Sequence, residues 1–112
     1  KGEGVAKDPA QAVAWYRKAA EQGNAHAQVA LGDCYYKGEG IAKDPAEAVV
    51  WYRKAAERGD VRAQLSLGRC YEYGEGVAKD KAEAEKWYSK AVEQSRMDEA
   101  QAPRERRNAP RP

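Results

Sequence analysis

The side chains of this 112-residue chain best suited to covalent or metal chemistry are one histidine and two cysteines. His26 is the only histidine, and the sequence offers too few further ligands within reach of it for a zinc site. It also has no Cys or Ser at a spacing that suggests a nucleophile–base pair. We therefore expect His26 to be an exposed residue near a helix start, and we expect no catalytic residue, metal site or cofactor.

The chain has two cysteines, Cys34 and Cys70, a number that would allow one disulfide or half of the ligands of a metal site. They occupy the same position of successive sequence units, so they should lie about one interhelical spacing apart, roughly 8–10 Å. A disulfide needs Cα atoms within about 6.8 Å. The sequence predicts two free, largely buried thiols, which indicate no particular redox compartment.

The segment GEGVAKD, which begins at Gly74, resembles a glycine-rich phosphate-binding loop, because it leads into a helix N-terminus with a lysine nearby. A P-loop, however, follows a strand and ends in Gly-Lys-Ser/Thr. Here the loop follows a helical segment, and its last residue, Asp80, would repel phosphate. A turn is the preferred interpretation.

Three tryptophans, Trp15, Trp51 and Trp87, could form a stacking platform for nucleobases or sugars. They recur strictly at the interior of a predicted helix. Stacked repeats need the same bulky residue in every layer, so we predict that all three tryptophans are core residues.

The formal charge of +2 comes from the C-terminal tail, since residues 1–94 carry fifteen charges of each sign. The tail, RMDEAQAPRERRNAPRP, combines three prolines with five arginines and is expected to be flexible. Its arginines could contact acidic protein or nucleic acid, but no aromatic residues are interleaved with them, so nucleic acid is not favoured. No apolar run approaches the roughly 18 residues of a membrane-spanning helix.

All of these residues sit on a repeat of 36 residues, which self-comparison detects at once. Gly38 aligns with Gly74, and the pair Trp51–Tyr52 aligns with Trp87–Tyr88. We predict a repeat domain over residues 1–94, made of a half unit 1–23 and full units 24–59 and 60–95, followed by a helix extension and Pro/Arg-rich tail over 95–112.

Each unit contains the signals of two helices. Asp44 is a predicted N-cap with Pro45 at the first helical position, and Gly59 supplies a left-handed stop. Asp60 then caps a second helix that runs to about Tyr73. We call the helices that begin near Ala25 and Val61 helix A, and the helix that follows Asp44 helix B.

The last unit departs from this pattern. Lys81 replaces the proline at the helix start, and Ser95 replaces the terminal glycine, so the stop signal is missing. Helix B of this unit is therefore expected to continue through Met97 and Ala100 toward Pro103, a helix breaker.

Positions that are identical in both copies of helix A recur at spacings of three and four and predict a buried face. They are Ala27, Leu31, Cys34, Tyr35 and Gly38, matched by Ala63, Leu67, Cys70, Tyr71 and Gly74. Gly32 and Gly68 each cost about 1 kcal/mol relative to alanine in a helix interior. We therefore expect a close neighbour at both, with the Trp-Tyr pair of helix B nearby.

Positions that differ between the copies predict a recognition surface on helix A. The predicted partner-binding residues are His26, Val29, Asp33, Tyr36, Lys37, Arg62, Leu65, Arg69, Glu72 and Tyr73. The tyrosines would act as aromatic anchors, Val29 and Leu65 as an apolar floor, and Asp33, Arg69 and Lys37 as charge selectors. The alternative for any one of them is an ordinary solvated helix face.

The pattern LGxxYxxGxGVxKDxxxAxxWYxKAAxxG resembles the Sel1-like repeat, a relative of the tetratricopeptide repeat, over residues 1–94. The resemblance implies an all-α superhelix, or solenoid, with the A helices on its concave side. It also implies a non-enzymatic adaptor or scaffold that binds a protein or peptide, in bacterial periplasmic or secreted assemblies or in the endoplasmic reticulum.

Two other functions stay open at this point. The first is self-association through the solenoid ends or the tail, because so few units leave apolar ends. The second is a hydrolase or a binder of cell-wall precursors, although no Ser-x-x-Lys or other nucleophile motif is present. The chain opens inside a repeat, so the natural protein is expected to begin further upstream, and the partner and compartment stay open.

Overall fold

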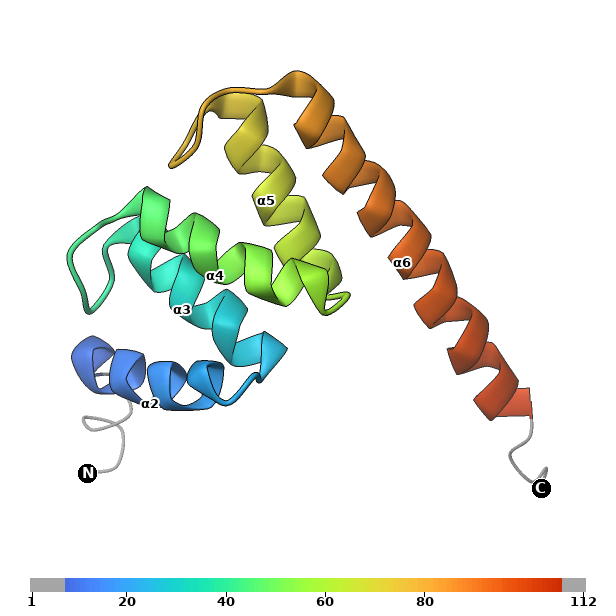
Figure 1. The fold of residues 1–112 in the computed structure, drawn as a ribbon. Helices are drawn as coiled ribbons and strands as arrows, with labels where there is room; N and C mark the ends of the chain where they lie inside the picture. The colour runs from blue at the N-terminus through green and yellow to red at the C-terminus, as the bar shows by residue number, and fades with distance from the viewer. Residues whose placement is uncertain (1–7, 108–112) are drawn as a thin grey trace.

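The structure is a computed structural model that describes residues 8–107, with side chains described for residues 8–101. Within this range the chain forms five helices and no strand (Figure 1). They are α2 (Pro9–Glu21), α3 (Ala25–Lys37), α4 (Pro45–Glu57), α5 (Val61–Tyr73) and α6 (Lys81–Arg107). Each helix packs on the one before and after it, so the fold is the predicted all-α solenoid. Helix A of the two full units is α3 and α5, and helix B is α4 and α6, with α2 the helix B of the half unit.

Side-chain caps start the helices where the sequence predicts them. Asp44 Oδ1 accepts a hydrogen bond from the backbone N–H of Glu47 at 3.2 Å, and Asp60 Oδ1 accepts one from Ala63 at 3.0 Å. Gly59 has a φ of +94°, which is a left-handed conformation that few other residues adopt. These caps satisfy backbone groups that have no partner inside the helix.

Most of the predicted core face of helix A is buried, but Tyr35 and Tyr71 are half-buried and the position at its end is exposed. Leu31 and Leu67 are fully buried, and Cys34 and Cys70 lie beside them. Gly38 and Gly74 share the spacing of this face but are exposed, so their assignment to the core was wrong. They are the C-caps of α3 and α5, with φ of +76° and +69°, and turn the chain into the loop to helix B.

The glycines inside helix A make room for a tyrosine of helix B. A Cβ atom placed on Gly32 would lie 2.7 Å from Tyr52 Cε1, and one placed on Gly68 would lie 2.6 Å from Tyr88 Cε1. The predicted close neighbour is thus the tyrosine of the Trp-Tyr pair. It allows α3 to approach α4 and α5 to approach α6.

The tryptophans do not all lie in the core. Trp51 and Trp87 are 8% and 6% exposed, but Trp15 is 67% exposed, so the prediction for Trp15 was wrong. Trp51 packs in a cluster with Leu31 and Cys34 of the preceding α3. In the described part of the chain no A helix precedes α2, so Trp15 lacks the surface that would bury it.

The last helix continues beyond the repeat, as the missing glycine predicts, and α6 extends past the end of α5 (Figure 1). The expected break at Pro103 was wrong, because the helix runs to Arg107. A proline leaves the carbonyl four residues earlier without a donor. That residue, Glu99, is exposed, and water can satisfy its carbonyl. The tail after Arg107 lies outside the described residues.

None of the helices in residues 8–107 combines the length and the apolar composition required to cross a membrane.

Replacing the glycine under the tyrosine ring should destabilise the chain. In an exposed helix Gly→Ala would stabilise by about 1 kcal/mol, but in Gly68→Ala the new methyl group collides with Tyr88 and should cost about 1–3 kcal/mol. Urea unfolding measures the change. In a Tyr88→Ala background, where the ring is absent, the same substitution should be neutral or stabilising. An equal penalty in both backgrounds would refute the contact.

Two tryptophans offer a matched comparison of buried and exposed rings. Lys18 lies 5.8 Å from the Trp15 ring centroid and Lys54 lies 5.7 Å from that of Trp51, so the cation contact is the same. Trp51→Ala should lower the free energy of unfolding by about 3–5 kcal/mol, and Trp15→Ala by less than about 1 kcal/mol. Similar losses in urea unfolding would contradict the different burial of the two rings.

Candidate binding surface

A cleft of about 370 Å³ lies between the two A helices, and we call it the α3–α5 cleft. Its lining comes only from α3 and α5. The lining residues are Val29, Asp33, Tyr36, Lys37, Arg62, Leu65, Ser66 and Arg69. The structure thus brings together seven of the ten predicted partner-binding residues, and adds Ser66. The other three, His26, Glu72 and Tyr73, do not line it.

The apolar part of the cleft is mostly provided by one residue. Leu65 is 46% exposed and offers its side chain to a ligand. Val29 is only 2% exposed and packs in the core with Val49 and Tyr52. Its prediction as a partner-contacting floor residue was therefore wrong, since Val29 supports the cleft from below.

The hydroxyls of Tyr52 and of the half-buried Tyr88 reach the A-helix face and bind two of its carboxylates. Tyr52, which is fully buried, donates to Asp33 Oδ1 at 2.5 Å. Arg69 takes the position of Asp33 in the next unit, and there Tyr88 donates to Glu72 Oε1 at 2.5 Å. Burial and these hydrogen bonds raise the pKa of both tyrosines. Asp33 and Glu72 therefore have a structural task that the sequence did not reveal.

Tyr36 is held by contacts from the second unit. Its hydroxyl donates to Glu75 Oε1 at 2.9 Å, and the guanidinium carbon of Arg69 lies 4.8 Å from its ring centroid. The hydrogen bond to Glu75, followed by burial, raises the pKa of Tyr36. Glu75 was not predicted, because it lies in the loop after α5 and no helical spacing links it to Tyr36.

Two predicted residues are exposed outside the cleft. His26 has an 86% exposed side chain, as expected near a helix start, and its Nδ1 atom lies 4.0 Å from Asp60 Oδ2. Tyr73 is 63% exposed at the last position of α5. Neither can contact a ligand that lies only inside the cleft.

The charge of the cleft is positive. Lys37, Arg62 and Arg69 line it together with a single carboxylate, Asp33. In the described part of the chain the ion pairs are His26–Asp60 and Lys86–Glu83, so none of the three cations has a carboxylate within 4.0 Å. Such an arrangement attracts anionic groups and disfavours cationic ones.

The cysteines do not contribute to a site. Cys34 and Cys70 are free and buried, as predicted. Burial raises the pKa of both thiols, that of Cys70 to about 11. Within residues 8–101, no group of three or more His, Cys, Asp or Glu side chains could hold a metal ion.

Comparison with known protein families gives three matches along the chain. A model of the Sel1 repeat matches residues 1–24, 25–60 and 61–95. No curated protein sequence matches the chain.

Solved structures with related sequences have the same architecture. A protective antigen of uropathogenic Escherichia coli strains, which displays an SLR fold, is 52% identical over 83% of this chain and 20% of its own, with a TM-score of 0.80. A Sel1 repeat protein from Oxalobacter formigenes is 41% identical, with a TM-score of 0.72. The cysteine-rich protein B of Helicobacter pylori is 32% identical, with a TM-score of 0.71.

The chain spans only part of these relatives. The matches to the last two relatives include 73% of this chain. They include 63% of the Oxalobacter protein and 62% of the Helicobacter protein.

The raised pKa of Cys70 predicts a loss of stability in alkaline solution. The folded thiol keeps its proton up to about pH 11, whereas the unfolded thiol ionises near its ordinary pKa of 9.0. The stabilisation is complete below pH 9, and the free energy of unfolding should fall by about 1 kcal/mol per pH unit between 9 and 11. Urea unfolding across this range measures the slope. Cys70→Ala should reduce the slope, and an unchanged slope would contradict the assignment.

Proposed function

The chain belongs to the Sel1 repeat family, and we propose that it binds a segment of another protein in the α3–α5 cleft. Sel1 repeats form a fold that is generally used for protein–protein interaction and generally serves as a non-enzymatic scaffold. Solenoids of this kind commonly bind through the extended surface that successive repeats build together. The α3–α5 cleft is such a surface, because both full units contribute to it.

The observation that carries the proposal is the set of three cations without carboxylate partners around an exposed leucine. Lys37, Arg62 and Arg69 would each gain from a ligand carboxylate, while Leu65 would gain from an apolar side chain. The ligand that fits is a segment with acidic residues next to an apolar one. Complementary charge would raise the association rate and select against basic segments.

The cleft is also ordered before a ligand arrives. Arg69 lies over the Tyr36 ring, and Glu75 holds that ring by accepting a hydrogen bond from its hydroxyl. A side chain that is already held loses less conformational entropy when it binds. Arg69 is therefore the proposed anchor of the ligand carboxylate, with Lys37 and Arg62 at the exposed rim.

Self-association through the solenoid ends stays a prediction. Trp15 and Tyr16 are 67% and 37% exposed on α2, whereas their counterparts Trp51 and Tyr52 are buried by the preceding helix A.

The proposal predicts the composition of peptides that bind the chain. Peptides selected from a random displayed library should be enriched in Asp and Glu beside an apolar residue, and their binding should weaken as salt is raised. Charge reversal at the rim, as in Lys37→Glu or Arg62→Glu, should weaken a selected peptide by at least about tenfold in calorimetry, which is roughly 1.4 kcal/mol.

Lys18→Glu provides the matched control, because Lys18 is also exposed but lies on α2, outside the cleft. It should leave the affinity unchanged. Selection of peptides without acidic residues, or equal losses in the rim and control variants, would exclude the α3–α5 cleft as the site.

A further inference from the structure

Among the described residues, α2 is the one helix B without a helix A on its aromatic pair. Trp15 is 67% exposed and Tyr16 is 37% exposed, and Ala12 and Ala19 beside them are half-buried. These four residues lie on one side of α2, because positions three and four apart are neighbours on a helix. Figure 1 shows α2 at the outer end of the stack, with α3 as its neighbour. We call this side the open α2 face.

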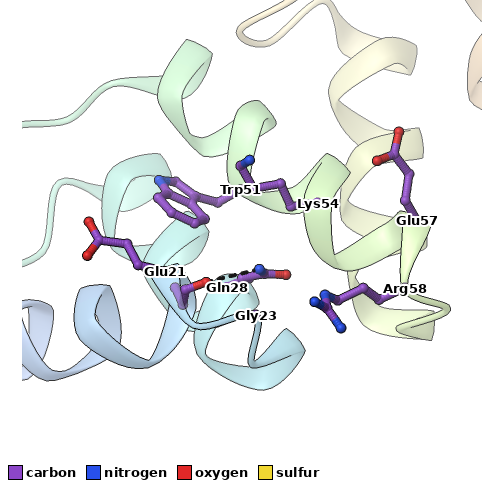
Figure 2. A pocket seen from close by; sticks show the side chains of 8 residues that line it. Glu21, Gly23, Gln28, Trp51, Lys54, Glu57 and Arg58 are labelled. Atoms are coloured by element: carbon purple, nitrogen blue, oxygen red, sulfur yellow. Dashed lines mark hydrogen bonds between the residues drawn. The ribbon is translucent and has the colours of Figure 1, made fainter.

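At the four equivalent positions of α4 the side chains are buried, and α3 packs on this side. These residues are Ala48, Trp51, Tyr52 and Ala55, and none is more than 8% exposed. In Figure 2 the Trp51 ring extends from α4 toward α3, where it packs in a cluster with Leu31 and Cys34. In the next unit α5 packs on α6 in the same way. The structure therefore shows twice what kind of helix covers a face of this type.

The tyrosine of this face sets two requirements on the covering helix. A glycine lies under the ring, because a Cβ atom in its place would lie 2.7 Å from a carbon of Tyr52 or 2.6 Å from one of Tyr88. Each hydroxyl also has a carboxylate acceptor on that helix. Asp33, directly after the glycine, accepts from Tyr52, and Glu72, four residues after it, accepts from Tyr88. Among residues 8–101 the hydroxyl of Tyr16 has no such acceptor.

The tryptophan of this face sets a third requirement. Leu31, directly before the glycine, and Cys34, two residues after it, form a cluster with Trp51. Leu67 and Cys70 occupy the same positions of α5, and both are fully buried. A helix suited to this face therefore carries Leu-Gly-x-Cys, with a carboxylate one or four residues after the glycine.

We propose that the open α2 face binds a helix with this pattern, supplied in trans by another polypeptide. The leucine and the cysteine of that helix cover Trp15, its glycine lies under the Tyr16 ring, and its carboxylate accepts from the Tyr16 hydroxyl. Ala12 and Ala19 are alanines as in α4, so the two backbones are free to approach closely. An amphipathic helix that docks through spaced anchor residues is a common mode of recognition.

A second copy of the chain fits this face less well than such a helix. The first and last helices of the described stack, α2 and α6, are both B helices. An end-to-end contact would therefore place one helix B on another, with no glycine for the Tyr16 ring. Helices α3 and α5, which carry the glycine, are already packed between B helices. The open α2 face also lies outside the α3–α5 cleft, so the inference does not depend on the proposed function.

The test adds a peptide with the sequence of residues 24–38, NAHAQVALGDCYYKG, to the 112-residue chain under reducing conditions. Only the chain is labelled with ¹⁵N. In NMR titration the indole N–H signal of Trp15 should shift, whereas the signals of the covered Trp51 and Trp87 should not move. The peptide should also gain helix signal in circular dichroism, because an isolated helix of this length is marginal in water.

The decisive comparison is the same peptide with alanine in place of its glycine. Alanine makes a free helix more stable, yet its methyl group would collide with the Tyr16 ring, so this peptide should bind at least about tenfold more weakly. To Tyr16→Ala, where the ring is absent, the alanine peptide should bind as well as the glycine peptide or better. Arg62→Glu, in the α3–α5 cleft, should leave both affinities unchanged, which separates this result from the proposed function.

Three results would overturn the inference. They are an unmoved Trp15 signal, equal affinity of the two peptides for the unchanged chain, and a loss of peptide binding in Arg62→Glu. A mass that rises with concentration in light scattering, together with a Trp15 signal that moves when the chain alone is diluted, would assign the face to a second copy instead. If Tyr16→Ala does not fold, the comparison of the two peptides on the unchanged chain decides alone.

Discussion

The contact between a glycine of helix A and a tyrosine ring of helix B sets the geometry of each repeat. At Gly32 and Gly68 the absent Cβ atom leaves room for Tyr52 and Tyr88, and any larger residue would push the helices apart. The glycine costs helix stability, which the close packing of the aromatic ring offsets. The same pair of helices packs most extensively within each unit. This one contact therefore fixes how helix A lies on helix B.

The same tyrosine connects the core to the A-helix face, and this restricts the surface. Its hydroxyl is brought to that face, where it is partly shielded from water and gains from an acceptor. Asp33 fills this need in one unit and Glu72 in the other. Because Glu72 accepts the hydrogen bond from Tyr88, the position equivalent to Asp33 does not need to be a carboxylate. Arg69 occupies it. The cation of the α3–α5 cleft is thus available because the acceptor lies one turn away.

Local signals in the sequence were sufficient to predict most of the fold. They were not sufficient to predict which particular positions are buried. Asp44, Pro45 and Gly59 mark helix ends through backbone chemistry that does not depend on neighbours. The recurrence of Gly32 and Gly68 indicated a close contact, although it did not distinguish the tyrosine from the indole.

The errors occurred where an outcome depends on a neighbouring element. Trp15 has the sequence context of Trp51 but lacks a helix against it, and Val29 differs between copies yet faces the core. The spacing of Gly38 predicted that it lies on the buried face. It is exposed instead, because it is the C-cap of α3. Gln28 and Gln64 carried a usable signal, because a polar residue identical in both copies sits among apolar core positions. Comparing the copies for polar identity would have indicated their burial and their hydrogen bonds to the Ala20 and Ala56 carbonyls.

Differences and identities between the repeats therefore separate the residues that can vary with a ligand from those that hold the fold. The α3–α5 cleft is built from residues that change between units, as Asp33 changes to Arg69, so its charge pattern can match a particular sequence of side chains. The residues that stay the same in both units, such as Gln28 and Gln64, instead hold the helices together, because each donates to a carbonyl in the last turn of the preceding helix.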